Sequence, residues 1–121
     1  MSDKRWINIC SLSDLVENSG VCALVEGATS ADNLTAKDKQ IALFSLPSMS
    51  EQVFAIDNFD PIGKANVLYR GMVGCNQGEP IVASPLYKQQ FSLKTGQCLQ
   101  EEAQVNTYPT RITDDCVEVL V

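Results

Sequence analysis

Short apolar runs rich in β-branched and aromatic residues recur along the whole sequence. Clusters of Gly, Pro, Asn, Asp and Ser separate them, a pattern typical of short strands joined by turns. We expect strands at residues 6–10, 21–25, 41–46, 53–56, 81–83, 90–93, 107–112 and 116–121. Pro109 lies inside one of these runs and predicts an edge strand or a bulge there. The pattern as a whole predicts a mainly β chain, folded as a small antiparallel barrel or sandwich.

Helix signals are weak by comparison. Residues 11–16 place Ser and Asp caps beside a short apolar pair, which predicts one or two helical turns. The polar stretch Gly27–Gln40 predicts either an exposed loop or a short solvent-facing helix over Ala31–Lys39, with a surface insertion as the simpler interpretation. Gly78-Glu79-Pro80 is interpreted as a hairpin connection without chemistry of its own.

Composition narrows the possible functions. A length of 121 residues favours a single domain, residues 1–121. The net charge of -6, with no run of basic residues, argues against nucleic acid as a partner. The chain has no histidine, which excludes Ser-His-Asp, Cys-His and histidine-ligated metal chemistry. No apolar run is long enough to span a membrane, and the N-terminus does not resemble a secretory signal, so we expect a cytoplasmic protein without a membrane partner.

The cysteines are scattered and form no C-x-x-C pair. With no secretory signal, we expect reduced thiols. Cys10, Cys22 and Cys116 lie in apolar runs and are expected to be buried as small hydrophobic residues. Cys75 lies in a Gly-rich stretch expected to form an exposed turn, and nothing nearby in sequence would lower its pKa.

Two proline-bearing loops lie between Ala55 and Gly96 and carry most of the information. They contain Asp60-Pro61-Ile62 and Ser84-Pro85-Leu86-Tyr87, and Phe91-Ser92-Leu93-Lys94-Thr95-Gly96 follows them. This arrangement resembles the cluster-binding region of Rieske ferredoxin-type domains, which carry C-P-H, C-P-x-H and F-D-L-x-T-G. The resemblance implies a Rieske-like fold with a smaller loop-and-hairpin subdomain, vestigial here, at about residues 57–97.

The four cluster-ligand positions of that pattern are changed in this chain. Asp60 and Ser84 stand at the thiolate positions, and Ile62 and Tyr87 stand at the imidazole positions. A Rieske cluster needs two thiolates and two imidazoles. We therefore expect the fold without the cluster, and no metal, cofactor or catalytic residue in this chain.

A longer set of strings is similar to the small subunits of assimilatory NAD(P)H-dependent nitrite reductases. The strings include A-I-D-N-x-D-P, R-G-x-V-G, G-E-P-x-V-A-S-P-L-Y-K-Q and T-G-x-C-L. This resemblance implies a non-catalytic, cytosolic accessory subunit in nitrate assimilation. Its partner would be a large subunit that carries FAD, an iron–sulfur cluster and sirohaem and reduces nitrite to ammonium with six electrons. The segment 27–40 is longer than expected for the family and is interpreted as an extended loop.

Two alternatives stay open: an electron carrier with unusual ligands, and a stand-alone β-barrel interaction module. Asp60, Ser84 and Tyr87 could bind an ion or contact a redox partner. The favoured interpretation is that the Asp60 and Ser84 side chains cap their own turns while Tyr87 packs where an imidazole would stand. Aromatic and cationic residues in these loops are candidates for partner contact, unless the two tyrosines only cover the loops: Tyr69, Arg70, Leu86, Tyr87, Lys88 and Gln89.

Overall fold

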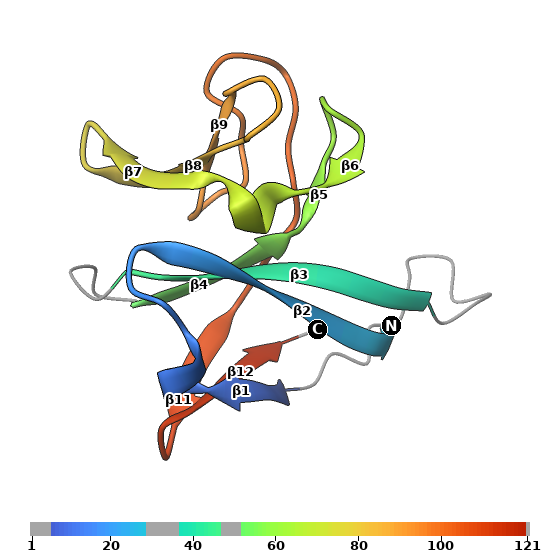
Figure 1. Cartoon of the computed structure of the whole chain (residues 1–121), viewed down its shortest axis with the longest axis vertical. Helices are drawn as coiled ribbons and strands as arrows, with labels where there is room; N and C mark the ends of the chain where they lie inside the picture. The colour runs from blue at the N-terminus through green and yellow to red at the C-terminus, as the bar shows by residue number, and fades with distance from the viewer. Residues whose placement is uncertain (1–5, 29–36, 47–51, 121) are drawn as a thin grey trace.

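The computed structural model describes residues 6–28, 37–46 and 52–120, and arranges them in three layers (Figure 1). The expectation of a mainly β chain with antiparallel sheets is confirmed, and the described part contains no helix with the length and apolar character needed to cross a bilayer. The strands are β1 (Trp6–Ser11), β2 (Ser19–Ala28), β3 (Lys37–Ser45), β4 (Val53–Asp57), β5 (Phe59–Asp60), β6 (Ala65–Asn66), β7 (Met72–Asn76), β8 (Glu79–Ala83), β9 (Gln90–Ser92), β10 (Thr107–Tyr108), β11 (Thr110–Thr113) and β12 (Cys116–Leu120).

The middle layer is a four-stranded sheet in the order β10-β4-β3-β2. Its central strands are buried on both faces, because alternate residues enter two different cores. Ala42 and Phe44 of β3 point into the upper core, and Ile41 and Leu43 point into the lower one. Successive side chains of a strand point to opposite faces, so a strand covered on both sides reads as a continuous apolar run. The residues of β4 alternate in the same way.

The lower layer is a three-stranded sheet in the order β1-β12-β11. It pairs the two ends of the described chain, with Trp6 opposite Leu120. Val117 and Val119 of β12 are fully buried against the middle sheet. A register shift between Asn8 and Cys10 marks a bulge in β1.

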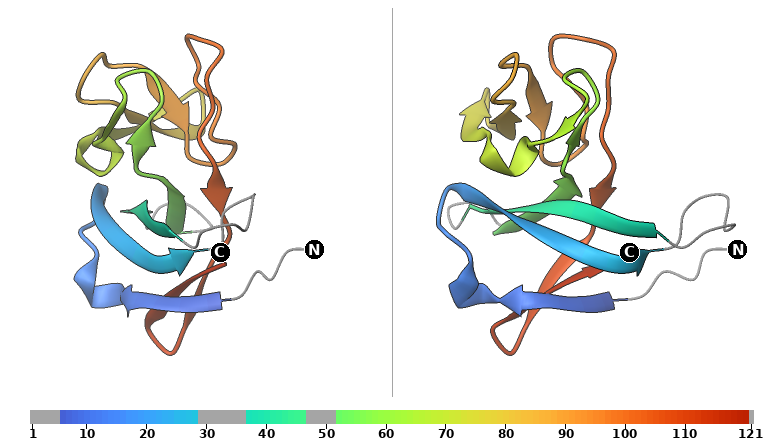
Figure 2. Two further views of the ribbon diagram at one scale, coloured as in Figure 1. Left: turned by 90° about the vertical axis from the view of Figure 1, so that its right-hand side faces the viewer. Right: turned by 45° about the vertical axis from the view of Figure 1, so that its right-hand side comes forward.

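The upper layer contains the sheet β7-β8-β9 and the hairpin β5-β6 (Figure 2). Its buried side chains pack directly on the middle sheet, so one continuous core joins the two layers. The upper layer and the segment that follows it contribute Leu68, Val82, Phe91, Leu93, Cys98 and Val105 to that core. The short 3-10 helix η2 (Leu68–Arg70) connects the β5-β6 hairpin to β7.

Several local predictions need correction. Residues 107–112 are not one strand, because Pro109 separates β10, which pairs with the middle sheet, from β11, which pairs with the lower one. Of the two alternatives for 27–40, the loop is wrong at residues 27–28 and 37–40, which belong to β2 and β3, and the helix over 31–39 is wrong at residues 37–39, while residues 29–36 lie outside the described residues. The hairpin turn is confined to Gln77 and Gly78, so Cys75 lies in β7, where it is exposed as expected.

The other predictions of helix and burial give mixed results. A single 3-10 turn, η1 (Leu12–Asp14), follows Ser11 in a capping box, in line with the expected short helix. Cys22 is exposed and Cys10 and Cys116 are only partly buried, whereas Cys98 is buried in the upper core. The prediction of burial was therefore wrong for Cys22 and only partly right for Cys10 and Cys116. All five cysteines are free thiols, as expected.

Candidate functional site

Two loops of the same backbone design lie at the upper end of the molecule, one after β5 and one after β8 (Figure 1). In the first, the Lys64 amide donates to the Asp60 carbonyl at 2.7 Å, and in the second the Lys88 amide donates to the Ser84 carbonyl at 3.0 Å. Both lysines adopt left-handed backbone angles, with φ of 62° and 67°. We call the residues 60–64 and 84–88 the tip.

Asp60 and Ser84 cap their own turns, as the sequence predicted. Asp60 Oδ1 accepts hydrogen bonds from the amides of Ile62 at 2.8 Å and Gly63 at 3.0 Å. Ser84 Oγ accepts a longer one, 3.3 Å, from the Leu86 amide. Each side chain thereby fixes the first turn of its loop, and the serine does so more weakly.

The two capping side chains also bond to each other. Ser84 Oγ donates to Asp60 Oδ2 at 2.5 Å. Both residues are buried, with 0% of the surface of Asp60 and 1% of that of Ser84 exposed. A bond from a hydroxyl to a buried carboxylate is of the strong, charge-assisted kind. The loops also touch through Gly63, where an added Cβ would lie 2.3 Å from Leu86 Cδ1. The tip is therefore one unit closed by the Asp60–Ser84 bond, which sequence reasoning did not identify.

Tyr87 does not occupy the place of an imidazole. Its exposed fraction is 63%, so the prediction that it packs inside the tip is wrong. Ile62 is the residue that turns inward, where it packs partly buried against the upper core. Tyr87 instead stands beside the exposed Leu86 and Lys88 on the surface of the second loop.

The remaining candidates for partner contact differ in accessibility. Arg70 is exposed, with its guanidinium carbon 5.8 Å from the centroid of the Tyr69 ring. Tyr69 itself is partly buried and packs on the upper core. Gln89 is also partly buried and donates to Glu101 Oε2 at 2.8 Å. The structure thus brings Leu86, Tyr87 and Lys88 together as exposed side chains and leaves Tyr69 and Gln89 less available.

Asn58 is a buried residue whose role sequence reasoning missed. Its Oδ1 accepts from the Tyr69 amide at 2.8 Å, and its Nδ2 donates to Gln40 Oε1 at 3.0 Å and to Cys22 Sγ at 3.6 Å. The side chain is fully buried. Asn58 therefore anchors η2, and with it Arg70, to strands β2 and β3. The polar pair Asp57-Asn58 between an apolar run and a proline loop was the available signal.

The residues at the four Rieske ligand positions do not fit a cluster. Ile62 has no ligand atom, and Asp60 and Ser84 use their oxygens on each other and on backbone amides. A Rieske cluster requires two imidazoles, and the chain contains no histidine. Among the described residues, no group of three or more His, Cys, Asp or Glu side chains is placed to hold a metal ion.

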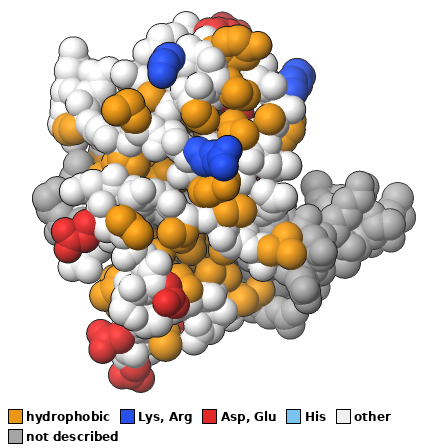
Figure 3. Space-filling view, in the orientation of Figure 1, with side chains coloured by type: hydrophobic (Ala, Val, Ile, Leu, Met, Phe, Trp, Pro, Cys, Tyr) orange, Lys and Arg blue, Asp and Glu red, His pale blue; other side chains and the backbone are white. Residues whose placement is uncertain are grey.

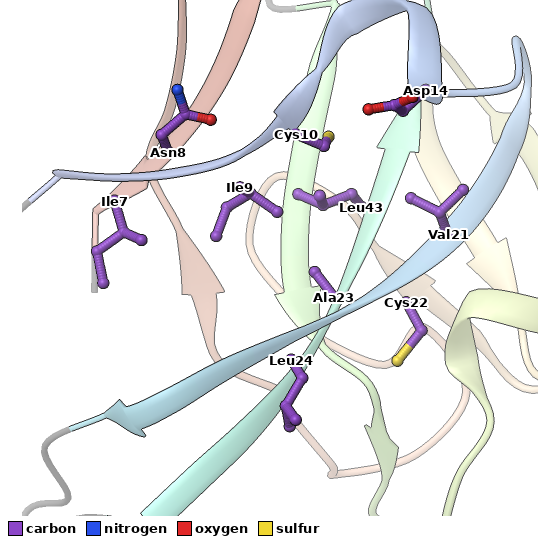
Figure 4. A pocket seen from close by; sticks show the side chains of 10 residues that line it. All are labelled: Ile7, Asn8, Ile9, Cys10, Asp14, Val21, Cys22, Ala23, Leu24 and Leu43. Carbon is purple, nitrogen blue, oxygen red and sulfur yellow. The ribbon is translucent and has the colours of Figure 1, made fainter.

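A groove of about 340 Å³ lies between β1 and β2, the edge strands of two different sheets (Figure 4). Apolar side chains including Ile9, Val21 and Leu43 line it, and Cys10 and Asp14 are its chemically distinctive members. Burial, with smaller effects from Asp14 and Cys116, raises the pKa of the Cys10 thiol. The thiol is therefore held protonated and is not activated as a nucleophile. Asp14 is already used in the cap of η1, where it accepts from the Ser11 amide.

Comparison with known proteins agrees with this fold. The family model of the Rieske-like [2Fe-2S] domain matches residues 5–120. The nitrite reductase (NADH) small subunit of Salmonella typhimurium is 42% identical over 95% of this chain and 96% of its own length. A solved structure of the putative NADH-dependent nitrite reductase small subunit from Mycobacterium tuberculosis is 34% identical, with a TM-score of 0.82 over 99% of this chain and 97% of that one.

A third relative places a similar sequence inside a longer protein. The nitrite reductase [NAD(P)H] large subunit of Klebsiella oxytoca is 37% identical over 98% of this chain, which corresponds to 11% of the Klebsiella protein. The family model and the near full-length identities lead to the same assignment. This chain belongs to the Rieske-like domain family and, within it, to the small subunits of NADH-dependent nitrite reductases.

Proposed function

We propose that this chain is the non-catalytic small subunit of an NAD(P)H-dependent nitrite reductase and accompanies a large subunit that reduces nitrite to ammonium. The observation that carries the proposal is the 42% identity to the Salmonella small subunit over nearly the full length of both chains. The Klebsiella large subunit, which includes a similar sequence, supports association of the two parts. We place the complex in the cytoplasm, and the net charge of -6 argues against nucleic acid as a partner.

The chemistry of the tip supports an accessory role. Residues 57–97 would form a vestigial cluster-binding subdomain within a single domain, 1–121, and the Asp60–Ser84 hydrogen bond would close the space between the loops. FAD, an iron–sulfur cluster and sirohaem bound by the large subunit would supply the electron transfer. The small subunit itself offers no imidazole base and no activated thiol among Cys10 and Cys22, whose pKa values are both raised by burial.

Coexpression with the cognate large subunit tests the proposal. A tagged version of the full chain is expected to retain the large subunit on an affinity column. Nitrite-dependent oxidation of NADH or NADPH is expected to fall when this chain is left out of the coexpression. Failure to retain a correctly folded large subunit, together with unchanged nitrite reduction, would contradict the accessory role and favour a stand-alone interaction module.

The electron-carrier alternative makes a separate prediction. A cluster with unusual ligands would give visible absorbance and stoichiometric iron after anaerobic purification. We expect a colourless protein without stoichiometric iron, because Ile62 offers no ligand atom and Asp60 is already bonded to Ser84. Iron at two atoms per chain would refute the accessory proposal in favour of the carrier.

A further inference from the structure

The two loops of the tip end on the same residue type in the same conformation. Lys64 and Lys88 each stand four residues after the capping side chain, with their amides bonded to the carbonyl of that residue. Both have a positive φ, which a glycine adopts without steric cost and a lysine does not. Local backbone energetics therefore disfavour lysine at two equivalent places, as they disfavour the five other non-glycine residues with a positive φ in the described part of the chain, and the exposed positive charge of the two lysines is what sets these positions apart.

The charge of residues 57–97, which include the tip, differs from that of the rest of the chain. Residues 57–97 contain four basic and three acidic residues, whereas the remainder contains five basic and twelve acidic ones. The acidic residue of the tip, Asp60, is fully buried, while Lys64 and Lys88 are exposed. Figure 3 shows the lysine and arginine side chains of the visible face in its upper half and most acidic side chains in its lower half.

The positive charges of this region form no ion pair inside the described fold. The ion pair found among the described residues joins Arg111 and Glu118 in the lower layer, so Lys64, Arg70 and Lys88 form none there. Glu101, an acidic neighbour of the second loop, accepts a hydrogen bond from Gln89. Free ammonium groups on a fixed loop are therefore available to an outside partner.

Exposed apolar side chains stand beside these lysines. Tyr87 and Leu86 expose 63% and 43% of their surfaces, and Met72, which pairs with Ala83 just before the second loop, exposes 76%. Interfaces commonly place aromatic and large apolar residues at the centre and charged residues at the rim. The tip has this composition, and the Asp60–Ser84 bond keeps its two loops together before any partner binds.

We propose that the tip docks on an acidic, partly apolar surface of the nitrite reductase large subunit, with Leu86 and Tyr87 at the centre and Lys64 and Lys88 at the rim. This inference rests on the proposed function. An acidic partner surface attracts the tip and repels the acidic remainder of the chain, so the charge distribution orients the encounter as well as stabilising the complex.

Because Lys64 and Lys88 have left-handed backbone angles, replacing them by glycine gives a sharp test. The double variant Lys64→Gly and Lys88→Gly removes both charges and also relieves the backbone, so its thermal unfolding midpoint is expected to stay the same or rise. Its dissociation constant for the cognate large subunit is expected to rise about tenfold at low ionic strength. The difference from wild type is expected to shrink as added salt screens the charges.

Lys94→Ala is the matched control. Lys94 is exposed in the same subdomain but follows Leu93, whose amide bonds to Pro80 at the opposite end of β8 from the tip. Its loss is expected to leave binding unchanged. Tyr87→Ala is expected to weaken binding about thirtyfold, as for an aromatic anchor at the centre of an interface.

The outcomes separate the two proposals. If the full-length wild-type chain does not bind the large subunit, the proposed function itself is overturned. If wild type binds and the glycine double variant and Tyr87→Ala both bind equally well, the accessory function stands and the tip is not the docking surface. Weakening by Lys94→Ala equal to that of the double variant would also overturn the assignment to the tip.

Discussion

Replacing Ser84 by alanine removes the hydroxyl that joins the two loops of the tip. Asp60 Oδ2 then loses its partner at 2.5 Å while the residue stays fully buried, and the Leu86 amide loses an acceptor at 3.3 Å. A hydrogen bond to a charged group contributes about 1.5 to 3 kcal/mol, and leaving the charged acceptor buried without a partner costs the upper part of that range. We expect Ser84→Ala to lower the free energy of unfolding by about 3 kcal/mol.

Two further variants separate the bond from general disturbance of the site. Asp60→Asn keeps an acceptor for the Ile62 and Gly63 amides and an amide that can donate to Ser84 Oγ, so we expect a loss of only about 1 kcal/mol. Ser13→Ala removes an exposed hydroxyl in η1 and is expected to change stability by less than about 0.5 kcal/mol.

Urea unfolding followed by circular dichroism measures these differences, and a double-mutant cycle of Asp60→Ala and Ser84→Ala, in which each single change removes the bond, gives the coupling energy. We expect a coupling of about 1 to 2 kcal/mol. A Ser84→Ala variant as stable as Ser13→Ala, or a coupling near zero, would refute the view that this bond holds the tip together.

Three other changes test separate parts of the structure. Asn58→Ala leaves the Tyr69 amide and Gln40 Oε1 without their buried partner. In urea unfolding it is expected to lower the free energy of unfolding by about 3 kcal/mol, and a loss below about 1 kcal/mol would contradict the anchoring role of Asn58. Gly96 has a φ of 79°, and a Cβ added there by Gly96→Ala would lie 2.1 Å from the Val105 carbonyl oxygen. Gly78 has a similar φ of 87°, but a Cβ added there by Gly78→Ala would have no neighbour within 4 Å. Gly96→Ala is expected to lower the free energy of unfolding by about 3 kcal/mol or more, and Gly78→Ala by about 1 kcal/mol. Equal melting temperatures of the two variants would show that the contact with Val105 is unimportant. Burial and the hydrogen bond to Asp57 raise the pKa of Tyr108, so the contribution of Tyr108 to stability is expected to be constant below pH of about 10 and to fall above it. Denaturation measured against pH is expected to show a smaller alkaline loss for Tyr108→Phe than for the wild type.

The architecture could be predicted because its signals are local. Residues 41–44 and 53–56 are apolar at successive positions, and the structure covers both faces of β3 and β4. The capping roles of Asp60 and Ser84 followed from an Asx or Ser residue placed before Pro, since such turns depend on neighbours two or three residues away.

Tertiary packing decided the features that could not be predicted. Cys22 lies in an apolar run, but it belongs to the edge strand β2 and points away from the lower core that receives Val21 and Ala23. The Asp60–Ser84 bond joins residues 24 apart in sequence, so no local pattern predicts it. Tyr87 was assigned an inward position by analogy with an imidazole ligand, yet without a metal to bind, nothing holds that side chain inside.

The pairing of β1 with β12 has a consequence for how this domain can be combined with another. Trp6 and Leu120 are opposite each other in the lower sheet, and the middle sheet lies between that sheet and the tip (Figure 1). A covalent tether at either terminus would therefore leave the tip unobstructed while raising its effective concentration near the attached protein. The Klebsiella large subunit carries a similar sequence within one polypeptide, and this geometry allows that tethered arrangement and a separate, diffusing subunit to present the same surface.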